Sequence, residues 1–198
     1  MNKFYFIRHA QSIANKEDLL EGWLDSPLTE NGKEQAQRLS KVIDKDFDVI
    51  YCSPSLRTRQ TLAILMQNGI QCSQNVIYDD RLKELSLGIF ERKNYNNFSV
   101  DEKEQLRKVF KGENFTDHGG ESLQGLDLRL TPIWQTIFNE SLQNNYENTL
   151  IVTHNSAMRR LFQKMKIQIK DKDTSNASGY IITYQNDSFT VQSEIGPD

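Results

Sequence analysis

The chain has 198 residues, of which 37% are hydrophobic and 26% are charged, and its formal net charge is -3 at pH 7. This length and composition fit one globular core and exclude the low-hydrophobicity, highly charged pattern of a disordered protein. Because the net charge is slightly negative, no global positive field exists to hold nucleic acid or an acidic membrane surface, so an anionic ligand would need a local basic cluster.

Strands and helices alternate along the predicted secondary structure. In chain order, the apolar patterns predict a strand at 5–7, a helix at 29–43, a strand at 49–52, a helix at 55–66, a helix at 122–142, a strand at 150–152 and a helix at 156–165. Near the carboxyl terminus, residues 179–184 and 189–192 flank a polar turn and predict an antiparallel hairpin at the sheet edge. Short apolar strands alternating with helices predict an α/β fold with a mainly parallel sheet.

Nothing in the sequence divides the chain into separate domains, because it has neither a Gly/Ser-rich linker nor an internal repeat. We therefore expect a single domain over residues 1–198. Its least regular part is about 79–120, where Gly88 and Asn94 are among the residues that interrupt the patterns. A long insertion beside a strand end predicts a substrate wall or lid, with surface decoration as the alternative.

The two cysteines, Cys52 and Cys72, are too few for a disulfide framework, and we expect reduced thiols. The apolar run before Arg8 is too short for a signal peptide, and no segment approaches the roughly 20 apolar residues of a membrane-spanning helix. We therefore expect a cytoplasmic protein that binds neither nucleic acid nor membrane. The sequence leaves its oligomeric state open.

Two of the three histidines, His9 and His154, directly follow predicted strands. Ligands of parallel α/β sheets bind outside the carboxyl ends of the strands, so we expect both imidazoles in one crevice. Arg8 precedes the first histidine, and Arg57 lies in the first turn of the helix after strand 49–52. Two arginines and two histidines around a crevice predict a site for a small phosphate dianion. The alternative is that each histidine is a polar residue that merely closes its strand.

Paired histidines also occur in metal sites. A hydrolytic metal site would need further histidines or carboxylates at short spacing, and the sequence has no His-x-x-x-His or His-x-His motif. The positive charge of Arg8 beside His9 would also repel a divalent cation. We therefore expect no metal.

Six blocks in a fixed order carry a family resemblance. They are Arg8-His9-Ala10-Gln11-Ser12 with Asn15, Gly22 to Thr29 with Gly32, Ser53-Pro54 to Thr61 with Arg57, Arg81 to Glu84 with Gly88 and Glu91, Gly119 to Ser122, and Val152-Thr153-His154. Through these blocks, which span residues 4 to about 161, the sequence resembles the histidine phosphatase superfamily. The resemblance implies a phosphoglycerate mutase-like three-layer sandwich with helices on both faces of the sheet and an antiparallel edge strand.

The resemblance implies transfer of a phosphoryl group from a small phosphomonoester to His9, and then to water or a second acceptor, without metal or other cofactor. It assigns the proton transfers to Glu84. Arg8, Asn15, Arg57 and His154 are expected to hold the phosphate oxygens, the last as a cation or a hydrogen-bond donor. Gln11, Glu21 and Gly22 are expected to contact substrate.

Two positions depart from the family pattern. Ala10 stands where glycine is usual, and alanine would cost about 1 kcal/mol if the backbone there required positive φ. Asn155-Ser156 replaces the usual glycine-containing pair after the second histidine. This puts a backbone contact to phosphate in doubt, and the side chain of Asn155 is expected to bind phosphate instead.

Three functions remain open at this point. The residues after Glu84 are Leu85, Ser86 and Leu87, which lack the basic and aromatic pair of the mutases, and the interval from His9 to His154 looks short for a mutase. We therefore favour a broad-specificity phosphatase. A phosphoglycerate mutase is the alternative, and a non-catalytic phosphate-binding protein is the third.

Overall fold

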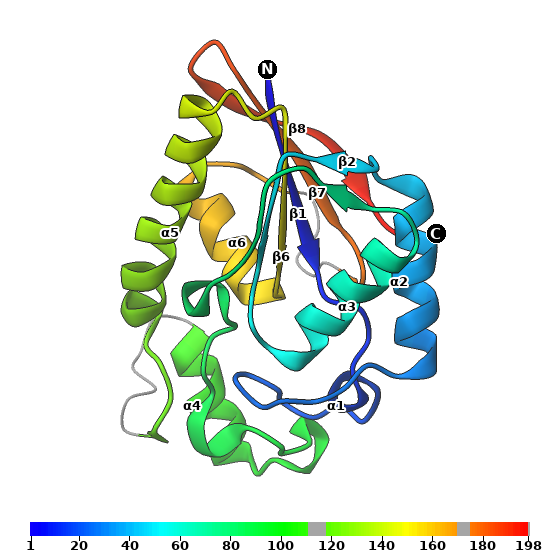
Figure 1. Ribbon diagram of the computed structural model, residues 1–198. Helices are drawn as coiled ribbons and strands as arrows, with labels where there is room; N and C mark the ends of the chain where they lie inside the picture. Colours follow the sequence, from blue (N-terminus) through cyan, green and yellow to red (C-terminus); the bar gives the residue numbers. More distant parts are fainter. Residues whose placement is uncertain (111–117, 170–174, 198) are drawn as a thin grey trace.

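A computed structural model describes residues 1–110, 118–169 and 175–197 of the chain. In this part of the chain the central sheet has six strands in the order β5-β3-β6-β1-β7-β8 (Figure 1). The strands are β1 (Asn2–Arg8), β3 (Val49–Cys52), β5 (Val76–Tyr78), β6 (Asn148–Thr153), β7 (Gly179–Gln185) and β8 (Ser188–Ile195). β5, β3, β6 and β1 are parallel, whereas β7 is antiparallel to both β1 and β8. This confirms the predicted mainly parallel sheet with an antiparallel edge.

Helices cover both faces of the sheet. The main ones are α2 (Glu30–Val42), α3 (Leu56–Gln67), α5 (Leu123–Gln143) and α6 (Asn155–Lys164). Figure 1 shows α5 and α6 on one side of the sheet and α2 and α3 on the other. Each predicted helix is present within one residue at each end. The side chains of Thr29 and Ser122 cap α2 and α5 by accepting hydrogen bonds from main-chain N–H groups.

The alternation of side chains along β1 explains how the helices on both faces are packed against the sheet. Phe4 and Phe6 belong to one buried cluster, in which Phe6 contacts Trp134 of α5 and Phe162 of α6. Tyr5 and Ile7 lie on the opposite face in a second cluster, which includes residues of α2 and α3. Because successive strand side chains point to opposite faces, a fully apolar strand is buried on both sides.

The segment after β5 is better ordered than the sequence predicts. It contains short 3-10 helices at Asp80–Leu82, Gly88–Phe90 and Tyr95–Asn97, followed by α4 (Val100–Phe110). Leu82, Leu85 and Phe90 are buried in the same cluster as α5 and α6, so apolar packing anchors this wall to the core. Residues 111–117 of the predicted insertion lie outside the described residues.

Four further elements were not predicted from sequence. They are the short helix α1 (Ile13–Lys16), the edge strand β5 of the central sheet, and the strands β2 (Asp46–Phe47) and β4 (Gln71–Cys72), which pair in a separate small sheet. All are too short to produce a hydrophobic period.

Burial raises the pKa of the Cys52 thiol to about 12.

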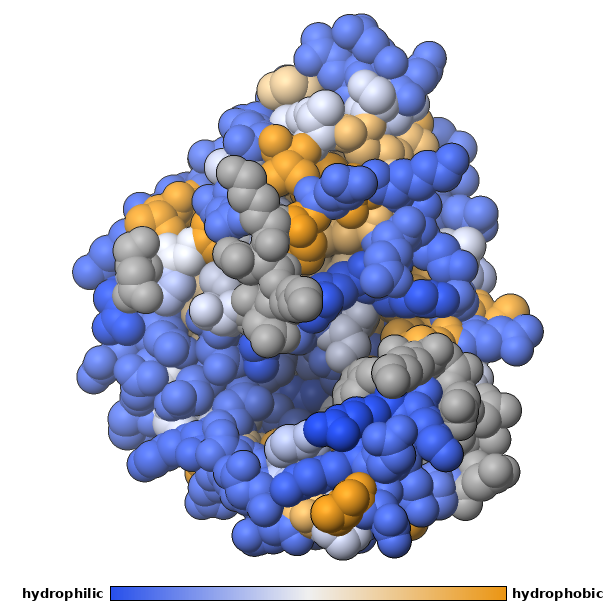
Figure 2. Space-filling view, turned by 180° about the vertical axis from the view of Figure 1, so that it is seen from behind, coloured by the Kyte–Doolittle hydropathy of each residue, from blue (hydrophilic) through white to orange (hydrophobic). Residues whose placement is uncertain are grey.

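The surface is mainly hydrophilic when the molecule is seen from behind, and this face is hollowed near its centre (Figure 2). Within the described ranges, no helix is both long and apolar enough to cross a membrane.

Candidate active site

The register between β1 and β6 brings the two strand-end histidines together. Arg8 is paired with Thr153, so His9 and His154 are each the next residue along neighbouring parallel strands. The N–H of His9 donates to the carbonyl of Thr153 at 3.1 Å, and the two imidazole centroids are 5.2 Å apart. Both histidines are almost completely buried. The expected crevice at the carboxyl edge of the sheet therefore contains both rings.

Arg57 connects the two histidines. It lies in the first turn of α3, directly after β3, and is only 1% exposed. Its Nε atom donates to Nε2 of His9 at 3.2 Å, and Nη2 lies 3.0 Å from Nδ1 of His154. The guanidinium also donates to the carbonyl oxygens of Gly22 and Leu24, each at 2.8 Å. These contacts fix the planar guanidinium of Arg57 between the two histidines and the loop that contains Gly22 and Leu24.

The hydrogen bonds of His9 define its neutral tautomer. Nδ1 lies 2.9 Å from the carbonyl oxygen of Ala10, which can only accept, so Nδ1 carries the proton and Nε2 has the lone pair. Burial, followed by the charges of Arg57 and Arg8, holds the pKa of His9 well below its usual range. His9 is therefore a neutral imidazole with its basic nitrogen facing the guanidinium.

His154 is neutral as well. Its Nδ1 accepts from Arg57, so the proton lies on Nε2, which donates to the hydroxyl of Ser53 at 2.8 Å. Burial, followed by the charge of Arg57, holds the pKa of His154 well below its usual range. This arrangement disfavours the cationic form expected from sequence as one of two possibilities, because an imidazolium would face a guanidinium at hydrogen-bond distance.

Glu84 enters the site from the wall segment after β5. Its carboxylate accepts hydrogen bonds from the main-chain N–H groups of Leu85 at 2.9 Å, Ser156 at 3.1 Å and Ala157 at 3.2 Å. The last two donors belong to the first turn of α6, where an anion is favoured by the free N–H groups and the helix dipole. The backbone after His154 therefore holds Glu84.

Arg129 of α5 fixes the main chain that carries Glu84. Its guanidinium donates to the carbonyl oxygens of Arg81, Lys83 and Glu84 at 2.6–2.8 Å, and it forms a two-point ion pair with Glu121. We did not anticipate Arg129 from the sequence. Glu121 belongs to the fifth family block, but its partner lies eight residues further on in a helix, where only the fold shows the contact.

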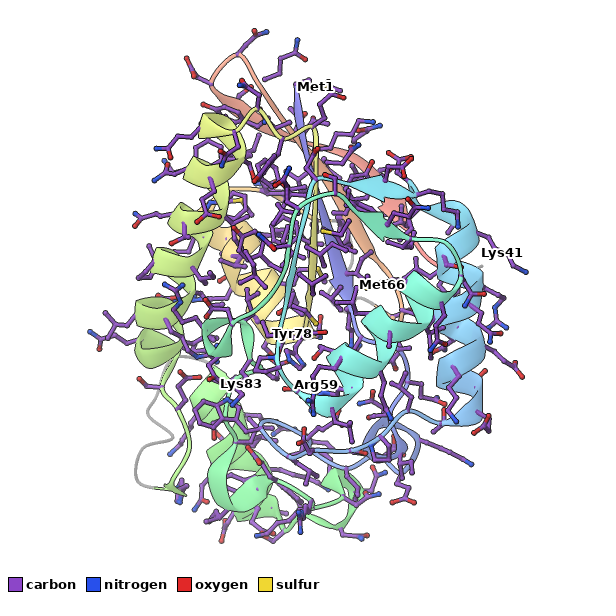
Figure 3. All side chains as sticks on the ribbon, in the orientation of Figure 1. Met1, Lys41, Arg59, Met66, Tyr78 and Lys83 are labelled. Atoms are coloured by element: carbon purple, nitrogen blue, oxygen red, sulfur yellow. The ribbon has the colours of Figure 1, made fainter. Side chains whose placement is uncertain are left out.

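A cavity of about 200 Å³ joins these side chains. Its lining comprises Arg8, His9, Asn15, Leu19, Leu20, Glu21, Gly22, Arg57, Glu84, Leu85, Leu87, Asn155 and Ser156. Nearly all predicted site residues are in this set, and His154 lies behind it against Arg57. Figure 3 shows the labelled Arg59 and Lys83 at the same end of the sheet, opposite Met1. An adjoining cavity continues outward past Tyr95, Asn96 and Asn176.

Asn15 is oriented by neighbours from both sides. Its Oδ1 accepts a hydrogen bond from Nδ2 of Asn176 at 2.9 Å and from the N–H of Ser12 at 3.3 Å. Its own amide nitrogen consequently faces Glu21, at 3.4 Å from Oε2. Asn176 also donates to the carbonyl of His9 at 3.2 Å. Nothing in the sequence singled out Asn176, which lies 161 residues from Asn15.

The side chain of Gln11 contacts the start of α2. This residue does not line the cavity, and its side-chain oxygen accepts hydrogen bonds from Thr29 at 2.8 Å and Asn31 at 3.2 Å. Its main-chain carbonyl accepts from the N–H of Thr29. Gln11 therefore ties the loop after β1 to the start of α2, and its contact with substrate stays a prediction.

The two departures from the family pattern have different outcomes. Ala10 is not among the residues with positive φ, and its N–H donates to the hydroxyl of Thr61 at 3.0 Å. Alanine therefore costs no backbone strain at this position. Asn155 lines the cavity, and its Oδ1 atom is buried with no hydrogen-bond partner among the described residues.

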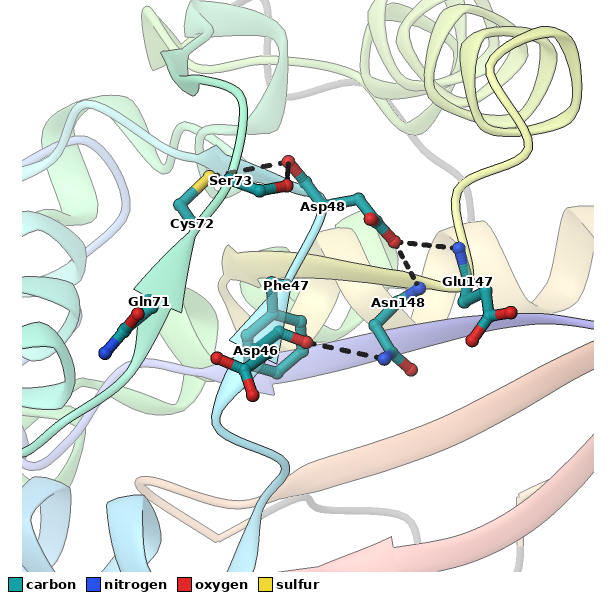
Figure 4. Close-up of a pocket in the computed structure, with 8 residues that line it drawn as sticks. All are labelled: Asp46, Phe47, Asp48, Gln71, Cys72, Ser73, Glu147 and Asn148. Atoms are coloured by element: carbon teal, nitrogen blue, oxygen red, sulfur yellow. Dashed lines mark hydrogen bonds between the residues drawn. The ribbon is translucent and has the colours of Figure 1, made fainter.

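A second cavity, of about 280 Å³, lies at the other end of the sheet, where β3 and β6 begin (Figure 4). Its polar groups are largely occupied with one another. The Asp48 carboxylate accepts from the main-chain N–H groups of Glu147 and Asn148, and its carbonyl accepts from Ser73. None of the predicted site residues lies there. Across the described ranges, no three His, Cys, Asp or Glu side chains are grouped so as to hold a metal ion.

A cavity lined by two arginines and His9, with His154 beside it, at the carboxyl edge of a mainly parallel sheet is the usual place for a ligand site in an α/β protein. The family model of the histidine phosphatase superfamily (branch 1) matches residues 4–194. The chain belongs to this superfamily.

Individual relatives agree with this assignment. The chain is 27% identical to a probable phosphatase of Schizosaccharomyces pombe, over 98% of both chains. It is 33% identical to a probable phosphoglycerate mutase of Escherichia coli, over 66% of this chain and 60% of that protein. The crystal structure of a phosphoglycerate mutase from Bacillus anthracis superposes with a TM-score of 0.79 at 25% identity, covering 97% of this chain and 92% of the other. Relatives named for both activities therefore match this chain.

Proposed function

We propose that the protein is a metal-independent phosphatase that hydrolyses small phosphomonoesters through a phosphohistidine on His9. The observation that carries the proposal is the neutral tautomer of His9, whose Nε2 keeps the lone pair and accepts a hydrogen bond from Arg57, in a cavity that Arg8 and Glu84 also line. A neutral imidazole nitrogen is a competent nucleophile toward phosphorus, and fixed guanidinium donors stabilise the charge on the transferring oxygens.

In the first step, Nε2 of His9 attacks phosphorus and the bond from phosphorus to the ester oxygen breaks. Glu84, as the acid, gives its proton to the leaving oxygen, which departs as an alcohol. In the second step, water attacks the phosphohistidine while Glu84 takes one of its protons, and the bond from phosphorus to Nε2 breaks. Inorganic phosphate leaves, and both residues return to their starting forms.

The phosphate-binding roles follow from the same cavity. Arg8 and Arg57 supply charge, and the amide of Asn15 supplies a donor whose orientation Asn176 fixes. His154 acts through Arg57, to which it is hydrogen bonded, and Asn155, which lines the cavity, contributes the N–H donor of its side-chain amide. The wall that begins at Glu84 forms the specificity side of the cavity.

The apolar part of the lining favours hydrolysis over mutase activity. Leu19, Leu20, Leu85 and Leu87 line the cavity, and Arg8 and Arg57 are the cationic residues among its described lining. A mutase must also hold the carboxylate of phosphoglycerate, which calls for a further cation. Similarity to proteins named as phosphoglycerate mutases nevertheless makes mutase activity the second candidate.

The decisive experiment assays the purified protein with p-nitrophenyl phosphate and a panel of metabolite phosphomonoesters in the presence of EDTA. We expect turnover that His9→Asn lowers by about a thousandfold or more. His118→Asn is the matched control, because this third histidine packs on Phe90 away from the cavity. Acid-labile phosphate should be trapped on His9 in the wild type only. Activity that disappears with EDTA or persists in His9→Asn would contradict the proposal.

A second assay separates the two candidates. It supplies 3-phosphoglycerate with and without 2,3-bisphosphoglycerate and follows both isomerisation and phosphate release. Release of inorganic phosphate without isomerisation is expected. Efficient interconversion that depends on the bisphosphate would identify a mutase.

A further inference from the structure

Glu21 is a buried carboxyl group inside the proposed phosphate cavity. Its side chain is 7% exposed, and Oε2 lies 3.3 Å from Nε of Arg57. The amide nitrogen of Asn15 donates to the same oxygen at 3.4 Å. The other oxygen, Oε1, is buried with no hydrogen-bond partner among the described residues. The carboxyl group therefore touches two of the donors that we assign to phosphate, and the hydroxyl of Ser12 is a further hydrogen-bonding group that acts on it.

This position creates a conflict of hydrogen bonding. An ionised carboxylate and a phosphate dianion both only accept hydrogen bonds, so two such groups at one set of donors repel each other unless a proton lies between them. The charged and polar groups that act on Glu21 come from four segments, and they are Arg57, Ser12, Arg8 and Glu84. One of them, Glu84, is itself acidic. The two arginines balance the dianion alone, so an ionised Glu21 would leave excess negative charge in the site, and an ionised Glu84 would add to it.

We propose that Glu21 contacts the phosphoryl group as a neutral carboxylic acid, donating the hydrogen of its carboxyl group to a phosphate oxygen. This inference rests on the proposed function and adds a second acid to the site, distinct from Glu84. Burial already raises the pKa of Glu21, although Arg57 opposes that shift. Placing a dianion beside the carboxyl raises it further. Phosphate binding is then coupled to the uptake of a proton at Glu21.

The coupling predicts a particular pH dependence. Above the pKa of Glu21 in the unliganded protein, phosphate affinity falls by up to about tenfold per pH unit, because each binding event must also protonate the carboxyl. Glutamine at this position has nearly the same shape and carries permanent amide donors. Glu21→Gln should therefore bind phosphate more tightly than the wild type at mildly alkaline pH and lose this component of the pH dependence.

The test is titration calorimetry with inorganic phosphate between about pH 5 and pH 8, in buffers of different ionisation enthalpy, which counts the protons taken up. The wild type, Glu21→Gln and Glu17→Gln are compared. Glu17 is the matched control, because it is an exposed glutamate that does not line the cavity. We expect Glu21→Gln to take up close to one proton fewer per phosphate and to bind about tenfold more tightly at the alkaline end. Glu17→Gln should behave as the wild type does.

Two results would overturn the inference. The first is that the wild type and Glu21→Gln take up the same number of protons on binding phosphate. The second is that Glu21→Gln binds phosphate more weakly than the wild type at every pH. That result would mean that the carboxylate only positions Arg57. Should the variant fold poorly in thermal unfolding, the wild type is measured at about pH 8, where free inorganic phosphate is already mainly the dianion, and zero proton uptake there also refutes the inference.

The assay is independent of turnover, so the two proposals fail separately. Phosphate binding with the expected proton difference but no ester hydrolysis would refute the proposed function alone. Hydrolysis through His9 without a Glu21-dependent proton would refute this inference alone. Absence of phosphate binding throughout would refute both.

Discussion

The Nε atom of Arg57 lies 3.2 Å from Nε2 of His9, the nitrogen that carries the lone pair. The same guanidinium binds His154 and the carbonyl oxygens of Gly22 and Leu24. One side chain therefore links the ends of β1 and β6 to the loop that carries Glu21. Substitutions at Arg57 and at the residues around the same cavity test this arrangement.

Replacing Arg57 by alanine should affect both catalysis and folding. We expect kcat/KM to fall by about 10² to 10³, because a fixed donor to the transferring oxygens is lost. Unfolding in urea should show a loss of about 3 kcal/mol, since Glu21 loses its buried partner. Arg57→Lys should restore little activity, because a single ammonium cannot replace the planar fork. Arg59→Ala, on the exposed side of α3, is the control, and equal effects of the two alanine variants would contradict this role.

Asn176 should act as a positioning residue for Asn15. In Asn176→Ala, the Asn15 amide loses the donor that orients it, and we expect KM to rise about tenfold with little change in kcat. Asn176→Asp should be at least as impaired, because a carboxylate cannot donate to the Asn15 oxygen or the His9 carbonyl. Steady-state kinetics and inhibition by inorganic phosphate measure the effect. A loss of stability with unchanged KM would assign a purely structural role.

Gly22→Ala should lower activity, in addition to the conformational free energy that alanine costs at positive φ. Gly22 has φ of +50°, and an added methyl group would overlap Oε1 of Glu91, which accepts from the N–H groups of Trp23 and Leu87. We expect kcat/KM to fall more than about tenfold, because the displaced loop also carries the carbonyl that holds Arg57. Gly69→Ala is the control: it has φ of +98° with nothing within 4 Å, so only the conformational cost of about 1 kcal/mol remains. Similar activity in both variants would contradict this role of the loop at Gly22.

Stability should fall on the acidic side of neutrality. His9 and His154 have pKa values held well below their usual range by burial and by Arg57, so the unfolded chain binds protons below about pH 6.5 that the folded chain does not. Each histidine contributes stability that is present above that pH and lost as the pH falls, by up to about 1.4 kcal/mol per pH unit. Urea unfolding between about pH 5 and pH 7 measures this slope.

The double variant His9→Asn/His154→Asn should have a flatter slope, whereas His118→Asn should keep the slope of the wild type. Glu21 contributes in the opposite sense, because its pKa is raised by burial, but it is common to all these proteins. Identical slopes in the wild type and the double variant would mean that the buried histidines are already charged in the folded protein.

Much of the fold was predictable because local patterns carry it. The strand 49–52 coincides with β3, and the helix at 55–66 differs from α3 by one residue at each end. The parallel direction of β1 and β6 follows from the intervening helices and places His9 and His154 at one edge. The wall after β5 was the least predictable part, because its short turns have no period to read.

The sequence by itself determined the α/β architecture and the strand ends at which Arg8, His9 and His154 meet, because hydrophobic period and strand direction are local properties. Tertiary structure alone decided that Gln11 faces α2, that Asn176 orients Asn15 and that Glu21 is buried against Arg57. Each of these depends on hydrogen bonds between groups 18 to 161 residues apart. Such contacts are set by how loops pack together, and no spacing along the chain encodes them.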